Sequence, residues 1–290
     1  MIKEYYQPLK LTEALNCLSL SPCSAHILAG GTDLLVNMRN GQIKPEVIVD
    51  LSKIGELKTI ALEGNNLSIG ALVTFSELAV HPLVQKLTPV LASSAKAVGS
   101  PQIRNRGTLG GNIANASPAA DLVPVLVALD GVAVIAKQNA FRKIPVAQLI
   151  VGPYKTSLKP GEIIVRVEVD VPPEGTGMVY KKVGRRNALA ISRLNGACLL
   201  KLEGEIIKDV SLVIGAATPT PHRFGEVEEY LIGKNISQEL LEEAGVMARE
   251  HVLAVTGKRP SSNYKLPVAE RLTVRLLQEA WKGDKVLCLS

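Results

Sequence analysis

The first segment that could do chemistry is the Gly-Gly-Thr-Asp run at residues 30–33, which follows a strand-like run at 26–29 and precedes a helical run at 33–39. Glycines lack a Cβ atom, so main-chain N–H groups can approach a bound anion closely, and the start of a helix adds free donors and a positive dipole end. The same residues also suit a purely structural turn in which Thr32 or Asp33 caps the helix. The segment therefore indicates either an anion site or a capped turn.

The second segment, residues 108–121, is more specific. Over 14 residues it combines hydroxyl and amide side chains, the adjacent Gly110 and Gly111, and a carboxylate at its end. Such a loop suits a pyrophosphate, which N–H and hydroxyl donors would wrap while Asp121 accepts hydrogen bonds from a ribose or an adenine. The structural alternative is a loop with a helix cap at Ser117 or Asp121. The density of polar groups favours ligand binding.

A dinucleotide-binding fingerprint of the G-x-G-x-x-G type is a competing interpretation, because Asp50 follows Gly30 by 20 residues at the end of an apolar run. The glycine spacing argues against it. Here Gly-Gly is followed by Thr-Asp-Leu-Leu-Val, with no third glycine at the required place. The sequence therefore does not favour a Rossmann domain.

Cysteine and histidine are too few and too scattered for a metal centre. The chain has four of each and no C-x-x-C pair, so a zinc or iron–sulfur site built from this chain alone is not expected. The formal charge of +6 makes nucleic-acid binding one possible interpretation. Because the chain has only three Phe, one Trp and six Tyr, aromatic residues on which bases could stack are scarce, and an ordinary basic surface is favoured. The sequence shows no apolar signal-peptide core and no membrane-spanning run, which makes the cytoplasm the expected compartment.

The elements that position these segments change in kind along the chain. Up to about residue 171, strand and helix signals alternate, with a Thr74–Glu77 capping box at the start of one helix and a long polar loop at 99–118. The Pro- and Gly-rich run 171–177 is the best candidate for a domain boundary. Beyond it an α+β domain is predicted, with strands at 178–183, 197–202 and 209–216 and helices at 225–232, 238–255 and 268–281.

The pairing of the two segments resembles the FAD-binding medium subunit of the molybdenum hydroxylases, the family of xanthine, CO and nicotinate dehydrogenases. The motifs are A-G-G-T-D at 29–33 and Q-I-R-N-R-G-T-L-G-G-N-I-A-N-A-S-P-A-A-D at 102–121. Further likenesses at 154–164, 180–186 and 264–265 extend the resemblance over the whole chain. It implies an α+β protein of the vanillyl-alcohol-oxidase/PCMH-like type. FAD-binding subdomains would span 1–57 and 58–174, and a C-terminal domain at 175–290 would hold a three-stranded antiparallel sheet with helices.

The resemblance also implies which residues hold FAD. The first segment would cradle the pyrophosphate, the second would complete the phosphate and sugar contacts, Ile164 would approach the flavin or its linker, and Lys181 would reach the cofactor from the C-terminal domain. Val98 stands where related chains often carry an aromatic residue, which puts a stacking role there in doubt. The implied cofactor-binding residues are Leu28, Ala29, Gly30, Gly31, Thr32, Asp33, Leu34, Thr108, Gly110, Gly111, Asn112, Asn115, Asp121, Ile164 and Lys181.

By the same resemblance, the protein would be an oxidoreductase subunit that passes electrons from iron–sulfur clusters on a partner through FAD to an acceptor such as NAD. Molybdopterin would reside on a large partner subunit and a 2Fe–2S cluster on a small one. No catalytic residue is expected in this chain, because the flavin supplies the chemistry. The basic stretch 181–201 fits either partner docking or a solvated strand face. An autonomous FAD-dependent reductase or oxidase and a cofactor-free basic binding module stay open as alternatives.

Overall fold

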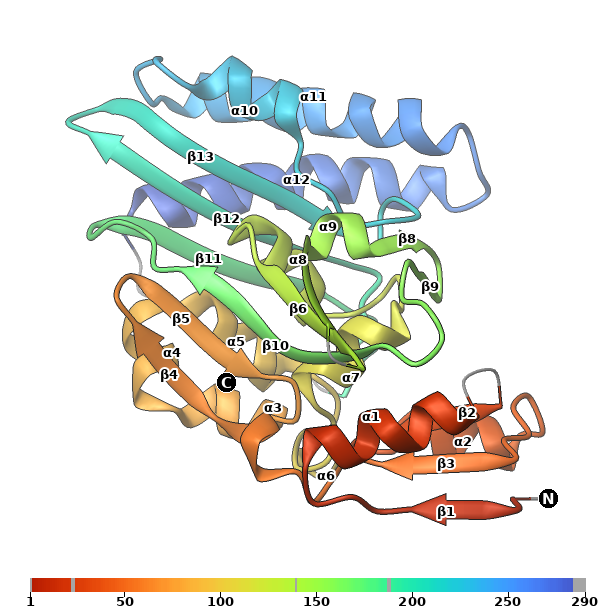
Figure 1. Ribbon diagram of the computed structural model, residues 1–290. Helices are drawn as coiled ribbons and strands as arrows, with labels where there is room; N and C mark the ends of the chain where they lie inside the picture. Colours follow the sequence, from red (N-terminus) through yellow and green to blue (C-terminus); the bar gives the residue numbers. More distant parts are fainter. Residues whose placement is uncertain (1, 22–23, 139, 187–188, 284–290) are drawn as a thin grey trace.

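The computed structural model describes residues 2–21, 24–138, 140–186 and 189–283. The chain begins with a small parallel sheet (Figure 1). Its strands are β1 (Glu4–Tyr6), β2 (Ala25–Leu28) and β3 (Val47–Asp50), in the order β1-β3-β2. All four residues of the central strand β3 are buried, as expected for an apolar run in a parallel sheet. Helix α1 (Leu11–Leu20) packs its buried face against this sheet, and α2 (Leu34–Arg39) follows the first glycine segment.

The second unit is a five-stranded antiparallel sheet in the order β4-β5-β10-β6-β7. Val167 of the central strand lies opposite Ile69 on one side and Ala133 on the other, and all three side chains are buried in the largest apolar core. The strands are β4 (Ile60–Glu63), β5 (Asn66–Gly70), β6 (Val132–Lys137), β7 (Ala140–Pro145) and β10 (Ile163–Asp170). The helices of this unit are η1 (Gly55–Lys58), α3 (Phe75–Val80), α4 (Pro82–Leu87), α5 (Pro89–Ala97), α6 (Pro101–Arg104), α7 (Leu109–Asn115), α8 (Leu122–Ala128) and α9 (Val146–Leu149), and a hairpin of β8 (Ile150–Gly152) and β9 (Lys155–Thr156) follows.

The C-terminal unit is an antiparallel meander of β11 (Thr176–Val183), β12 (Leu194–Glu203) and β13 (Ile206–Gly215), followed by three helices. Helices α10 (Gly225–Leu231), α11 (Gln238–Thr256) and α12 (Ser262–Trp281) cover one face of the sheet (Figure 1). The other face lies on α5 and α8 of the second unit. Alternate residues of β11 consequently belong to different cores: Tyr180 packs into the core of the second unit and Val179 into the C-terminal core.

The structure differs from the sequence-based expectation in several elements. The tract 99–118 is not an extended loop, because the short helices α6 and α7 form in it, capped by the side chains of Ser100 and Thr108. Helix α12 begins six residues before the predicted start at Val268 and includes Pro267 in its second turn. Strands β4 and β7 escaped prediction because most of their residues are exposed, so neither carries a clear apolar pattern.

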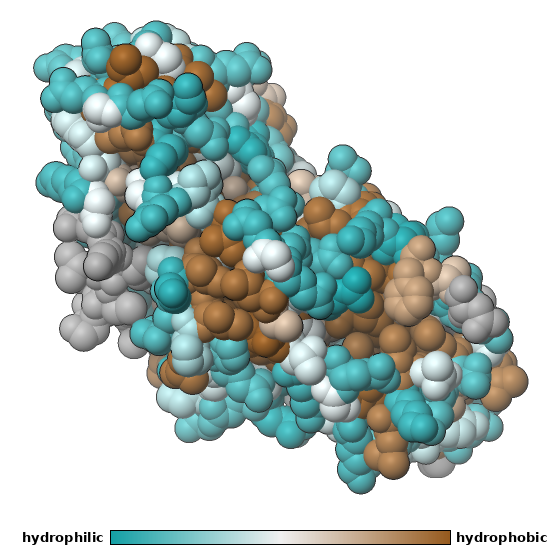
Figure 2. Space-filling model, turned by 60° about the vertical axis from the view of Figure 1, so that its left-hand side comes forward, coloured by the Kyte–Doolittle hydropathy of each residue, from teal (hydrophilic) through white to brown (hydrophobic). Residues whose placement is uncertain are grey.

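The surface drawn in Figure 2 is mainly hydrophilic, with apolar residues gathered near the middle and toward the lower right of the view. Over the described part of the chain, no helix combines the length and apolar character needed to cross a membrane.

Candidate functional site

A cavity of about 670 Å³ lies where the three units meet. Its wall combines apolar side chains, among them Ile27, Leu72, Phe75 and Val98, with polar groups from both glycine segments. A volume of this size and a mostly apolar lining with a few polar groups are typical of small-molecule and cofactor sites. The sequence-predicted residues that line it are Ala29, Gly30, Thr32, Asp33, Leu34, Thr108, Gly110, Gly111, Asn112, Asn115, Asp121 and Ile164.

The first glycine segment presents main-chain donors without partners. Among the described residues, no main-chain acceptor forms a hydrogen bond with the N–H groups of residues 30–34. Gly31 has a φ of +77°, which turns the chain from β2 into α2 and favours glycine at this position. A Cβ atom on Gly30 would overlap the main-chain carbonyl of Arg106, so glycine is required where this turn approaches the chain just before the second segment. The result is a run of free N–H groups at a helix start beside the cavity.

The main chain of the second glycine segment does not offer the free N–H donors that the sequence predicts. The N–H groups of residues 109–112 are all bonded within the chain, two of them to carbonyls of the 71–73 segment and two to Thr108. They therefore cannot donate to a ligand without breaking bonds already made. Side chains remain available instead, because Asn112 Oδ1 is buried without a partner. At the cavity wall, Asn115 Nδ2 donates to Asp33 Oδ1 at 3.1 Å, which joins the two segments.

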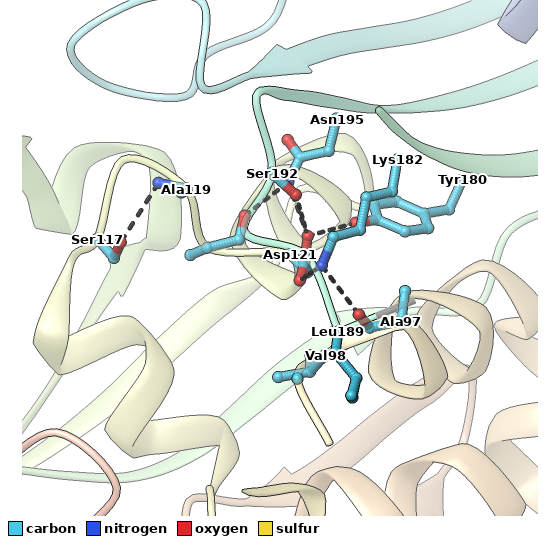
Figure 3. A network of polar contacts seen from close by, with 12 residues as sticks. Ala97, Val98, Ser117, Ala119, Asp121, Tyr180, Lys182, Leu189, Ser192 and Asn195 are labelled. Atoms are coloured by element: carbon cyan, nitrogen blue, oxygen red, sulfur yellow. Dashed lines mark hydrogen bonds and ion pairs between the residues drawn. The ribbon is translucent and has the colours of Figure 1, made fainter. Parts of the chain in front are cut away.

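The Asp121 carboxylate is the centre of a polar network that joins the second unit to the C-terminal sheet (Figure 3). Asp121 Oδ1 accepts hydrogen bonds from Tyr180 Oη at 2.7 Å, Ser192 Oγ at 2.6 Å and Asn195 Nδ2 at 3.1 Å. Its Oδ2 atom pairs with Lys182 Nζ at 2.6 Å. Burial and the Asp121 charge raise the pKa of Tyr180 well above its ordinary value, so this hydroxyl stays a donor. The oxygens expected to meet a sugar or an adenine are thus already engaged by protein groups.

The structure places Lys181 outside the cavity, in contrast to the expectation from the sequence. Lys181 Nζ pairs with Glu279 of α12 at 2.5 Å, on the far face of the C-terminal sheet. The next residue, Lys182, lines the cavity. The physical reason is that successive side chains of a β-strand point to opposite faces of its sheet. Leu28 and Gly31 also do not line the cavity; Leu28 is the last residue of β2, and Gly31 lies in the turn that carries the free N–H groups.

Two further residues of the wall were not anticipated. Glu162 is buried at the cavity, where Arg142 donates to both of its carboxylate oxygens at 2.8 and 2.7 Å. These hydrogen bonds hold the pKa of the Glu162 carboxyl below its ordinary value. Phe75 packs against Gly107, where no Cβ atom could be accommodated. Neither contact has a sequence signal, because both partners come from distant parts of the chain.

Metal-binding groups do not gather at this cavity. Within the ranges that the structure describes, no three His, Cys, Asp or Glu side chains are arranged to hold a metal ion. The free N–H groups of the first segment, the unpartnered Asn112 Oδ1 and the apolar side chains of the wall suit an anionic, partly apolar ligand.

Comparisons with known proteins cover almost the whole chain. Residues 1–172 match the family described as "FAD binding domain in molybdopterin dehydrogenase", and residues 178–280 match "CO dehydrogenase flavoprotein C-terminal domain". The glyceraldehyde dehydrogenase medium chain of Sulfolobus acidocaldarius is 31% identical over 95% of this chain and 97% of its own length. The carbon monoxide dehydrogenase medium chain of Hydrogenophaga pseudoflava is 31% identical over 96% of each. A solved structure of carbon monoxide dehydrogenase from H. pseudoflava matches with a TM-score of 0.92 at 30% identity, covering 98% of both chains.

Proposed function

Since this chain belongs to the family of FAD-binding subunits of molybdenum hydroxylases, we propose that it transfers electrons from iron–sulfur clusters on a partner subunit through FAD to an acceptor such as NAD. The partners would be a large subunit with molybdopterin and a small subunit with a 2Fe–2S cluster. FAD, once bound, supplies the redox chemistry, and this chain supplies binding and orientation. The division into 1–57, 58–174 and 175–290 is part of the proposal, with the cofactor between the three parts.

The observation that carries the proposal is the run of unpartnered N–H groups at residues 30–34. A diphosphate offers several anionic oxygens at once, and consecutive N–H groups at a helix start bind such a group without a metal ion. This segment therefore holds the FAD diphosphate. Gly31 acts through the turn, because its positive φ sets the chain direction there, and Leu28 ends the strand that leads into this turn.

The opposite wall contributes side chains and shape. Asn112, whose Oδ1 atom lacks a partner, accepts a hydrogen bond from the cofactor, and Asn115 holds the far side of the first segment through Asp33. Gly110 lets α7 pack closely on Ala71, Gly111 lies at the cavity wall beside the Thr108 hydroxyl, and Ile164 provides an apolar surface. Lys182 replaces Lys181 as the basic residue of the C-terminal unit at the site.

Ligand titration of the full-length protein tests the diphosphate site. Apoprotein should bind FAD, ADP should compete with it, and riboflavin should bind much more weakly because it has no phosphate. Gly111→Val places a side chain at the cavity wall and should weaken FAD binding by at least tenfold, which corresponds to about 1.4 kcal/mol. Gly225→Val is the matched control, since it also lies in the first turn of a helix but has no neighbour within 4 Å of its Cβ position.

The outcomes separate the parts of the proposal. Wild-type protein without measurable FAD affinity would overturn the cofactor assignment. Riboflavin binding as tight as FAD would overturn the role of residues 30–34. Copurification with a molybdopterin subunit and an iron–sulfur subunit tests the partners. Bleaching of the flavin absorbance by NADH under anaerobic conditions tests NAD as the acceptor, and unchanged absorbance would exclude it.

A further inference from the structure

Asp121 occupies a helix N-cap position but does not cap its helix. It is the residue before α8, and its side chain accepts no hydrogen bond from the main chain of the first turn. Aspartate is a preferred N-cap residue because its carboxylate usually accepts a hydrogen bond from an N–H group of the first turn, and Asp121 lacks that bond. All side-chain hydrogen bonds recorded for Asp121 come from β11, β12 or the segment between them. The carboxylate thus serves a contact between units rather than its own helix.

The network leads from the cavity wall into the interior of the C-terminal sheet. Asp121, Lys182 and Ser192 line the cavity, whereas Tyr180 and Asn195 lie behind them and do not. Tyr180 and Asn195 are buried, and each donates to the same Asp121 oxygen. Lys182 Nζ also donates to Ala97 O of α5 at 2.9 Å, so the ammonium group is held between two elements of the second unit. Two charged cavity groups are therefore oriented by residues outside the cavity.

We infer that Tyr180 and Asn195 are positioning residues that set the Asp121–Lys182 pair at the cavity and so couple FAD affinity to docking of the C-terminal sheet. The inference rests on the proposed FAD site. Hydrogen bonds to a charged group in a buried setting restrict its orientation more strongly than solvent would. Removing one of them lets the pair shift, and a displacement of the Lys182 ammonium changes its interaction with an anionic cofactor.

Tyr180→Phe is the sharpest test, because it deletes one hydroxyl that does not line the cavity. Ser211→Ala is the matched control. Its hydroxyl is buried in the same sheet and donates to Ala128 O of α8 at 2.8 Å, but it lies away from the cavity. For the full-length protein, the FAD dissociation constant and the melting temperature of the apoprotein are measured for each variant. We expect about tenfold weaker FAD binding for Tyr180→Phe and less than a twofold change for Ser211→Ala.

A double-mutant cycle distinguishes positioning from general loosening. If Tyr180 acts through the Asp121–Lys182 pair, Tyr180→Phe should not weaken FAD binding further in a Lys182→Met background. Additive effects would overturn the inference, as would an unchanged dissociation constant in Tyr180→Phe whose melting temperature falls. Should Tyr180→Phe fail to fold, Asn195→Ala removes another donor to the same oxygen from outside the cavity and takes its place in the cycle. Absence of FAD binding in the wild type would instead refute the proposed function.

Discussion

Replacing the Asp121 carboxylate by an amide should destabilise the protein strongly. In Asp121→Asn the shape is kept, but the negative charge opposite Lys182 is lost, and the amide can present an NH₂ group to an ammonium that has no lone pair to accept it. The side chain of Lys182 is only 15% exposed and that of Asp121 only 7%, so water replaces the lost partner poorly.

The magnitude follows from the burial of the pair. Removing one partner of a buried ion pair costs about 3–5 kcal/mol, because an uncompensated charge stays behind. Lys182 reaches the cavity wall and keeps its bond to Ala97 O, which places the expected loss near the lower end of that range. Folded proteins are stable by only about 5–15 kcal/mol, so such a loss is a large share of the total.

Urea unfolding of the apoprotein measures this loss, followed by circular dichroism and by fluorescence of Trp281, because a chain of several units need not unfold in one step. Asp130→Asn is the control: Asp130 also pairs across the units, with Arg223, but its side chain is 72% exposed. Exposed pairs of this kind contribute about 0–1 kcal/mol. A loss below about 1 kcal/mol in Asp121→Asn, equal to that of the control, would refute the reasoning.

Two further predictions concern the cavity wall. Hydrogen bonds from Arg142 hold the pKa of Glu162 below its ordinary value of 4.5, so the pair stabilises the fold above that pH and loses its effect as the pH falls through the lowered pKa. Urea midpoints should therefore be lower for Glu162→Gln than for wild type at pH 7, and the difference should shrink toward pH 3; a constant difference would contradict this. Gly30→Ala forces a methyl group against a main-chain carbonyl and should cost about 3 kcal/mol or more, seen as reduced soluble yield and a lower melting temperature. Gly225→Ala should leave both unchanged, and equal behaviour of the two variants would show that the segments can separate.

Features encoded by neighbouring residues were predictable from the sequence. The Thr74–Glu77 capping box forms as expected, with the Thr74 and Glu77 side chains each bonded to the other residue's main chain. The antiparallel meander after the proline-rich run and the α+β character also agree with the prediction. These features depend on turn residues, caps and apolar alternation over a few positions, all of which are visible in the printed sequence.

Features that depend on distant partners were not predictable. Whether Lys181 or Lys182 reaches the cavity depends on which face of β11 meets the second unit. That face is decided by α5 and α8, which end 79 and 48 residues before β11 begins. The N–H groups of Leu109 and Gly110 in α7 are occupied by carbonyls of the 71–73 segment, whose approach no local pattern indicates. The acceptors of Asp121 are filled by residues 59–74 positions away. In each case the chemistry of a residue was visible and its partner was not.

The two-faced packing of the C-terminal sheet limits how this chain could be divided or recombined. Residues of all three strands, such as Tyr180, Leu199 and Val213, complete the core of the second unit, while their neighbours complete the C-terminal core. A fragment that ended at the junction between the two family matches would leave the apolar side of α5 and α8 open to water. The two matched regions can thus be told apart in the sequence, but they share an apolar contact in the structure. An exchange of either region between relatives must keep the side chains by which the C-terminal sheet packs on α5 and α8.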